Sequence, residues 1–184
     1  MMNIKFEIAK PCDAEVLADI FWSHINAFPE YISHGEMQMG VGIASIAENG
    51  DIVPAPAGNG REMWLKYINE KMTSKDSAVV FKAVDGDVVA GFCVADIEED
   101  GADPFGMVCD VLVRGEYRNC GIGGMLLEKA VGWLKDKGIS DIYLESGKDN
   151  HSAHSFFEKR GFRKVSEIFR LGYNLDFNKK VISL

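Results

Sequence analysis

The stretch from Val111 to Leu127 constrains this chain more than any other part of its sequence. An apolar strand ends there, a loop containing Arg118, Gly121 and Gly123 follows, and a long helix begins. The first turn of a helix has backbone N–H groups without partners and a partial positive charge. Glycines let a bulky anion approach those groups, and an arginine adds a charged, forked donor. The stretch therefore predicts a binding site for a phosphate or a pyrophosphate.

The spacing of the glycines excludes two common phosphate-binding motifs. A dinucleotide-binding fingerprint has the pattern G-x-G-x-x-G, but the sixth position counted from Gly121 is Leu126. A P-loop has the pattern G-x-x-x-x-G-K-[ST], and the chain contains no Gly-Lys-Ser or Gly-Lys-Thr. A glycine-rich helix start can also be a simple tight turn, so the assignment needs a second motif.

Hydrophobic periodicity predicts the order β-α-α-β-β-β-α-β-α-β-β. The expected strands cover 4–8, 78–81, 88–94, 107–113, 139–144, 162–166 and 168–175, and the expected helices cover 13–25, 61–72, 121–137 and 150–159. Glycines and prolines interrupt the pattern over 29–60, where a short helix over 35–47 and a loop over 54–60 are expected. A loop of this length is often functional, and a mobile linker is the alternative.

Two segments resemble motifs of the GCN5-related N-acetyltransferase (GNAT) superfamily. Arg118–Gly123 resembles R/Q-x-x-G-x-G/A, and Asn150–Phe162 resembles N-x-x-A-x-x-F-Y-E-K-x-G-F, in the order and on the elements that the family uses. The resemblance implies an α/β (α+β) fold, with a central mixed, mostly antiparallel, twisted sheet of about seven strands flanked by helices. We expect one acetyltransferase domain over 1–184. Residues 29–60 match no motif and are expected to be an acceptor-side insertion or a mobile loop.

The resemblance implies acetyl-coenzyme A (acetyl-CoA) as the cofactor and assigns residues to it. The pantetheine arm is expected to pair, like an added strand, with the backbone of Val111, Leu112 and Val113. Asn150 matches an asparagine that contacts the arm, although it is also a good helix cap and both roles can coexist. The pyrophosphate is expected on the loop and helix start formed by Arg118, Asn119, Cys120, Gly121, Ile122, Gly123 and Gly124.

Phe157 departs from the family pattern. The family often has a tyrosine at this position, and that tyrosine can protonate the departing thiolate. Phe157 has no O–H group. Either water or a nearby tyrosine serves instead, or the thiol leaves without a general acid, because its pKa is not far from that of cysteine.

Asp110 and Glu145 are the candidate catalytic bases. An amine attacks a thioester only in its neutral form, and its pKa near 10 means that a proton must first be removed. Asp110 lies in an apolar strand, where an unpaired carboxylate is costly, and resembles an acidic residue of aminoglycoside and related acetyltransferases. A structural salt bridge is the alternative. Glu145, at the end of the next strand, is the second candidate.

Other polar and aromatic residues have no assigned role. Phe21, Trp22, Phe28, Tyr31 and Trp64 either line an acceptor pocket or belong to the core. A surface or capping role is favoured for His151 and His154, and nothing singles out His24 or His34.

Composition limits the classes of partner. The net charge of −8 argues against a dedicated nucleic-acid binder. The four cysteines include no CxxC pair, so no metal site is indicated. No apolar run is long enough for a membrane span, and no signal peptide is apparent, so we expect a cytoplasmic protein. Homodimers are common in the family, but no residue here indicates one.

The expected function is that of an acyltransferase. It moves an acetyl group from acetyl-CoA to a primary amine of a small molecule by direct attack in a ternary complex. The alternatives are acetylation of a protein N-terminus or lysine, and a non-catalytic acyl-CoA sensor. A covalent route through Cys109 or Cys120 is disfavoured, because neither has a His–acid arrangement nearby in the sequence.

Overall fold

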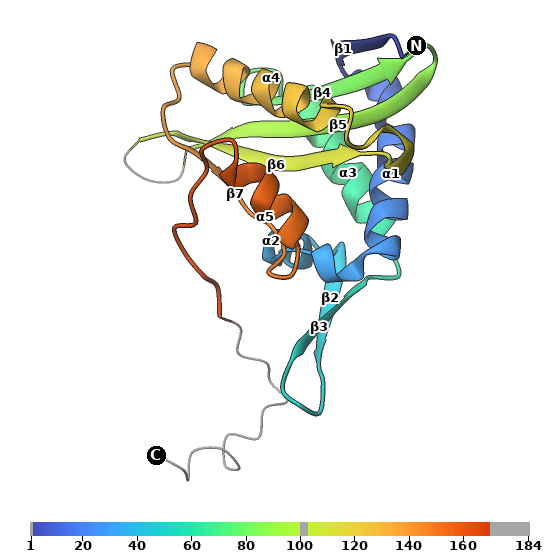
Figure 1. Ribbon diagram of the computed structural model, residues 1–184, viewed down its shortest axis with the longest axis vertical. Coiled ribbons are helices and arrows are strands. Elements are labelled where there is room, and N and C mark those ends of the chain that lie inside the picture. Colours follow the sequence, from blue (N-terminus) through green and yellow to red (C-terminus); the bar gives the residue numbers. More distant parts are fainter. Residues whose placement is uncertain (1, 100–102, 170–184) are drawn as a thin grey trace.

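A five-stranded sheet forms the centre of the protein (Figure 1). The computed structural model describes residues 2–99 and 103–169. The strand order is β1-β4-β5-β6-β7, with only β6 and β7 parallel. These strands are β1 (Ile4–Ile8), β4 (Ala78–Asp85), β5 (Val88–Glu98), β6 (Phe105–Val113) and β7 (Ile142–Leu144). The mixed, mostly antiparallel sheet is therefore confirmed.

Helices cover both faces of this sheet. Helix α4 (Ile122–Asp136) buries Ile122, Leu126, Ala130 and Leu134 against one face, because residues four apart share one side of a helix. Helices α1 (Ala14–Ala27) and α3 (Gly60–Thr73) cover the other face. The predicted helices over 13–25, 61–72 and 121–137 are thus confirmed to within two residues. Among the described helices, none has both the length and the hydropathy needed to cross a bilayer.

The segment over 29–60 has more regular structure than the sequence predicts. A short 3-10 turn, η2 (Pro29–Tyr31), and helix α2 (His34–Gln38) precede a hairpin of β2 (Gly42–Ile46) and β3 (Ile52–Pro56), which extends away from the main sheet (Figure 1). The expected helix over 35–47 is wrong beyond Gln38, and the expected loop over 54–60 is wrong at its start. Pro54 and Pro56 occupy alternate positions, so both missing N–H groups fall on the outer edge of β3, where proline is tolerated.

The chain after α5 (His151–Glu158) also differs from prediction. The strand expected over 162–166 is wrong, because these residues are irregular and pair with no described strand. Val165 is 76% exposed, so its apolar side chain is not used to dock this segment. The next expected strand, over 168–175, lies mostly outside the described residues. The alternating apolar pattern over 162–166 therefore does not lead to pairing with a described strand.

Leu126 tests the packing of α4 on the sheet. Its side chain is 0% exposed, whereas that of its neighbour Met125 is 46% exposed. We expect Leu126→Ala to lower the free energy of unfolding by about 2–5 kcal/mol, since it leaves a cavity under α4. Met125→Ala, the matched control, is expected to change it by less than about 1 kcal/mol. Urea unfolding measures both, and equal losses would contradict this packing.

Candidate functional site

Strands β6 and β7 diverge and leave an open strand edge. They pair only over Gly106–Val108 and Ile142–Leu144. Beyond Val108, the side of β6 that faces β7 pairs with no strand in the described part of the chain. An unpaired edge presents backbone N–H and C=O groups that an extended ligand can bind.

The register shows which groups of β6 face this edge. The N–H of Arg114 donates to Ala90 O near the start of β5, so the alternate residues Asp110 and Leu112 also direct their backbone groups toward β5. Val111 and Val113 consequently direct theirs to the open edge. Consistent with this, Val113 O accepts a hydrogen bond from Arg118 Nε at 3.2 Å. Of the three residues predicted for the pantetheine arm, Leu112 therefore directs its backbone groups toward β5 and not toward the open edge, and it lines the pocket.

A bulge at Cys109 sets the direction of Asp110. Val94 of β5 lies opposite Asp110 and Ala95 lies opposite Val108, so Cys109 is an extra residue in β6. Cys109 packs with the core under α1 and α3, and Asp110 interacts with Trp64 and Tyr67 of α3. Two consecutive side chains therefore lie on the same face, which a regular strand does not allow.

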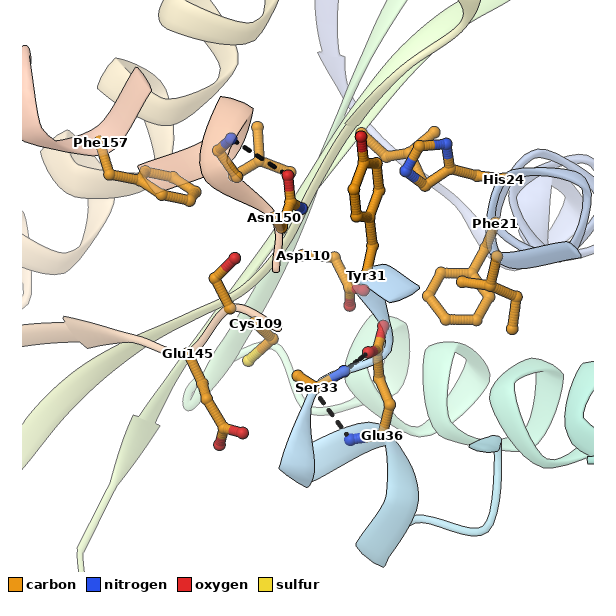
Figure 2. A pocket seen from close by; sticks show the side chains of 15 residues that line it. Phe21, His24, Tyr31, Ser33, Glu36, Cys109, Asp110, Glu145, Asn150 and Phe157 are labelled. Carbon is orange, nitrogen blue, oxygen red and sulfur yellow. Dashed lines mark hydrogen bonds between the residues drawn. The ribbon is translucent and has the colours of Figure 1, made fainter. Parts of the chain in front are cut away.

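A pocket gathers residues from five separate parts of the chain (Figure 2). Figure 2 shows Asp110 on β6, Tyr31 on η2, Glu36 on α2 and Asn150 before α5 around one space. The lining consists of Phe21, His24, Ile25, Tyr31, Ser33, Glu36, Cys109, Asp110, Val111, Leu112, Glu145, Ser146, Asn150, Ala153 and Phe157. The structure therefore brings both candidate bases together with the predicted pantetheine strand, Asn150 and Phe157.

The predicted phosphate loop leads from the β6 edge into α4. Asn119 and Gly121 have positive φ angles of 60° and 81°. None of the backbone N–H groups of 119–124 donates a hydrogen bond within the described residues. A Cβ added at Gly121 would meet no atom within 4 Å, so this side of the turn is open to a ligand. These features fit a diphosphate, whereas Gly124 packs against the guanidinium of Arg160.

Arg118 joins this loop to α1. Its Nη2 lies 3.2 Å from His24 Nδ1, and its guanidinium lies 5.7 Å from the centre of the Phe28 ring. Burial, followed by the charge of Arg118, lowers the pKa of His24 to about 4. His24 is therefore neutral at pH 7, and its Nδ1 can accept the hydrogen bond from Arg118.

The environment of Asp110 suits a general base. Burial, followed by the charge of Glu36, raises the pKa of Asp110 to about 7, against the opposing effects of Trp64, Tyr67 and Lys71. Neither Asp110 nor Glu36 forms an ion pair within the described residues. A base with a pKa close to the working pH is both substantially ionised and able to hold a proton.

Sequence reasoning missed Glu36. Its carboxylate accepts from the backbone N–H of Ser33, while its own N–H donates to Ser33 Oγ, which is a capping box at the start of α2. Burial raises the pKa of Glu36, and Glu145 adds to this effect. The pattern Ser-x-x-Glu was the available signal, but it indicates a helix start and not a pocket.

Glu145 contacts the start of α2. Its Oε1 accepts from the N–H of Gly35 at 3.1 Å, and its Oε2 lies 3.8 Å from His34 Nδ1. Nearby, a Cβ added at Gly147 would lie 2.5 Å from Tyr31 O. Glu145 therefore fastens α2 to the end of β7, and its assignment as a base stays a prediction.

Asn150 and Phe157 line the pocket from the side of α5. Asn150 Oδ1 accepts from Ala153 N at 3.1 Å and caps the helix. Its amide nitrogen can still donate to a ligand. Phe157 packs edge-on against Phe156 and Phe162, at 5.2 and 5.9 Å between ring centres.

Cys109 is a poor nucleophile despite its place in the pocket. Burial is the main cause that raises its pKa to about 11. Because the thiolate is the reactive form, the Cys109 thiol is almost wholly unreactive at neutral pH.

The raised pKa of Asp110 predicts a pH-dependent stability. The native state holds the proton up to about pH 7, whereas the unfolded chain releases it near the ordinary value of 3.8. Native protein therefore binds more protons in this window and loses stability as the pH rises through it. Asp110→Asn should avoid this loss, so its stability relative to wild type should rise by about 1–2 kcal/mol from pH 5 to pH 8, allowing for solvent screening.

Urea unfolding at several pH values measures this difference. Asp141→Asn, at an exposed position, is the control and should follow the wild type. Parallel curves for wild type and Asp110→Asn would contradict the assigned environment of Asp110.

Two curated relatives of this chain are N-acetyltransferases by name. The chain is 29% identical over 115 residues to N-alpha-acetyltransferase 30 of Schizosaccharomyces pombe, a match that covers 61% of this chain and 76% of that protein. It is 31% identical over 84 residues to the [ribosomal protein bS18]-alanine N-acetyltransferase of Haemophilus influenzae, covering 46% of this chain and 54% of that protein. The chain thus matches about half the length of the second relative.

Solved structures share the whole fold at low identity. A predicted acetyltransferase with acetyl-CoA from Clostridium acetobutylicum has a TM-score of 0.66 and 16% identity, with 92% of this chain and 96% of that chain covered. Aminoglycoside N-acetyltransferase AAC(6')-Iy in complex with CoA has a TM-score of 0.65 and 14% identity, with 95% and 97% covered. Both likenesses establish the fold.

The sequence model described as the Acetyltransferase (GNAT) family matches residues 47–162. The match covers well over half of the chain and includes the diverging strands, the glycine-rich loop and α5. This chain belongs to the GNAT family of acetyltransferases.

Proposed function

We propose that this protein transfers the acetyl group of acetyl-CoA to a primary amine of a small molecule. The observation that carries the proposal is the pair of carboxylates, Asp110 and Glu36, in one pocket with the open edge of β6. Neither has an ion-pair partner in the described part of the chain. Buried carboxylates without an ion-pair partner are costly, and an ammonium group is the ligand that complements them.

The chain offers acetyl-CoA a place along β6 and at α4. Backbone groups of Val111 and Val113 would pair with the pantetheine arm, while Arg118 and the free N–H groups of 119–124 would hold the pyrophosphate. When bound, the cofactor supplies an acetyl group activated as a thioester. The two solved structures above, one with acetyl-CoA and one in complex with CoA, support this choice of donor.

Asp110 performs the proton transfer that makes the amine reactive. Its carboxylate takes a proton from the acceptor ammonium, and the nitrogen lone pair then attacks the acetyl carbon. Glu36, which exchanges hydrogen bonds with Ser33, lines the same pocket and offers the incoming cation a second carboxyl group. Direct attack is favoured over a Cys109 intermediate, because that thiol remains protonated.

Tyr31 is the proposed proton donor for the leaving sulfur. Phe157 cannot donate, and Tyr31 lines the same pocket from η2 with its hydroxyl directed into the space beside Asn150 (Figure 2). Its ring is held by stacking on Phe28 at 5.1 Å between centres. A phenol in this position can protonate a thiolate as the C–S bond breaks.

Acetylation of a protein N-terminus is the second candidate. The names of the two relatives above favour it, since one is an N-alpha-acetyltransferase and the other is named for an alanine of a ribosomal protein. An N-terminal amine meets the same chemical requirement for a base and a negative pocket. Peptides and small amines offered in one assay distinguish the two.

Thiol release from acetyl-CoA with a panel of amines tests the function. We expect transfer to at least one small primary amine. In Asp110→Asn we expect kcat to fall about 100-fold or more, because a general base is removed. Affinity for acetyl-CoA, measured by calorimetry, should not change. Asp141→Asn is the control.

Transfer to peptides alone would replace the small-molecule proposal with the second candidate. Binding of acetyl-CoA without transfer to any amine would indicate a sensor. Full turnover in Asp110→Asn would remove Asp110 from the mechanism.

Tyr31→Phe tests the proton donor. We expect kcat to fall about tenfold or more with little change in KM, since binding does not depend on the hydroxyl. Adding Phe157→Tyr to this variant should restore turnover, because it supplies a phenol from α5. Tyr143→Phe, on the exposed side of β7, is the control. Unchanged kcat in Tyr31→Phe would exclude the role.

A further inference from the structure

One face of α3 remains unexplained by the proposed chemistry. Trp64, Tyr67 and Lys71 are spaced i, i+3 and i+7, so they lie on one side of the helix. Trp64 is fully buried and stacks on Phe21 at 4.5 Å between ring centres. This face lies against the sheet at the bulge, where Asp110 and Cys109 point toward α3.

Tyr67 is the member of this face that interacts with both residues of the bulge. It packs in the same cluster as Cys109, and its hydroxyl lies close enough to act on Cys109 and Asp110. Burial, followed by the charge of Asp110, raises the pKa of Tyr67 well above its ordinary value. The phenol therefore stays protonated at neutral pH and can donate a hydrogen bond to the carboxylate.

Lys71 brings a positive charge to the same place. It forms an ion pair with Asp96 of β5, which is 3% exposed, and its Nζ lies 5.4 Å from the centre of the Tyr67 ring. Asp96 holds the lysine in position, because a buried carboxylate requires a partner. The ammonium is thereby fixed beside the ring of Tyr67.

The groups acting on Asp110 come from every element packed around it. Glu36 on α2 opposes its negative charge, as do the thiols of Cys93 on β5 and Cys109 on β6 if they ionise. Trp64, Tyr67 and Lys71 on α3 act in favour of it. Among these described groups, the positive charge is carried by Lys71. The indole N–H of Trp64 is buried and close enough to Asp110 to favour its charge, but it forms no hydrogen bond of standard geometry in the described structure. It is therefore a donor still available to a carboxylate that gains charge.

We propose that Trp64, Tyr67 and Lys71 form a positioning face that orients the Asp110 carboxyl and stabilises its charged form. The inference rests on the proposed function, in which Asp110 is the base. Tyr67 donates a hydrogen bond to the carboxylate, and Lys71, anchored by Asp96, supplies the compensating charge. These are positioning residues, since they act on the acceptor only through Asp110.

The pH dependence of kcat/KM tests this face. In Tyr67→Phe and Lys71→Met, the carboxylate loses a donor or a positive neighbour, so the rising limb should move to higher pH. A shift from about 7 to about 8 lowers kcat/KM about fivefold at pH 7 and has little effect above about pH 9. Lys66→Met, 74% exposed on the same helix, is the control, and Lys71→Arg should keep the wild-type limb.

Lys71→Met leaves Asp96 buried and unpaired, so Lys71→Met/Asp96→Asn is the variant to use if the single change fails to fold. Tyr67→Phe is nearly isosteric and gives an independent result. A uniform loss of kcat/KM at every pH, with the limb in place, would overturn the proposal and leave a purely structural role.

A second readout needs neither cofactor nor acceptor. The pH dependence of unfolding, taken as the difference between each protein and its Asp110→Asn counterpart, reports the Asp110 titration directly. Its midpoint should move upward in Tyr67→Phe and Lys71→Met. If no amine is acetylated but this midpoint moves, the proposed function fails and the positioning face stands. If amines are acetylated and this midpoint does not move, the proposed function stands and the positioning face fails.

Discussion

The extra residue at Cys109 in β6 is the feature on which the rest of the site depends. It places Cys109 and Asp110 on the same face of the sheet, so a carboxyl that would otherwise lie toward α4 lies against α3 and the pocket. Just before the bulge, pairing between β6 and β7 ends. One irregularity therefore coincides with both the open strand edge and the direction of the candidate base.

The pocket is closed by a segment that contributes charge as well as shape. Glu145 holds the start of α2, and Gly147 lets the backbone of Tyr31 approach the end of β7. Glu36 thereby reaches Asp110, and their repulsion helps keep a proton on Asp110 near neutral pH. The arrangement costs stability, which the donors of α3 partly offset. Such a compromise is expected where a buried carboxyl must release and take up a proton.

The sequence predicted the parts of the site that depend on local pattern. Helix α4 and its glycine-rich start were found because apolar periodicity and turn residues act over a few positions. Asp110 was found because a carboxyl is unusual in an apolar strand. Glu36 and Tyr67 were not assigned to the site, because their role depends on contacts between segments far apart in the chain. The β2–β3 hairpin was missed for a local reason, since its prolines imitate a loop.

Hydrogen–deuterium exchange with and without acetyl-CoA tests the central claim most directly. Amides that face the open edge or begin α4 should exchange more slowly when the cofactor is bound. The cofactor would accept hydrogen bonds from these N–H groups or shield them from water. Slower exchange is expected in peptides that span 109–113 and 119–124, with little change in the β2–β3 hairpin. Unchanged exchange in both peptides at saturating acetyl-CoA, or protection confined to another part of the chain, would contradict it.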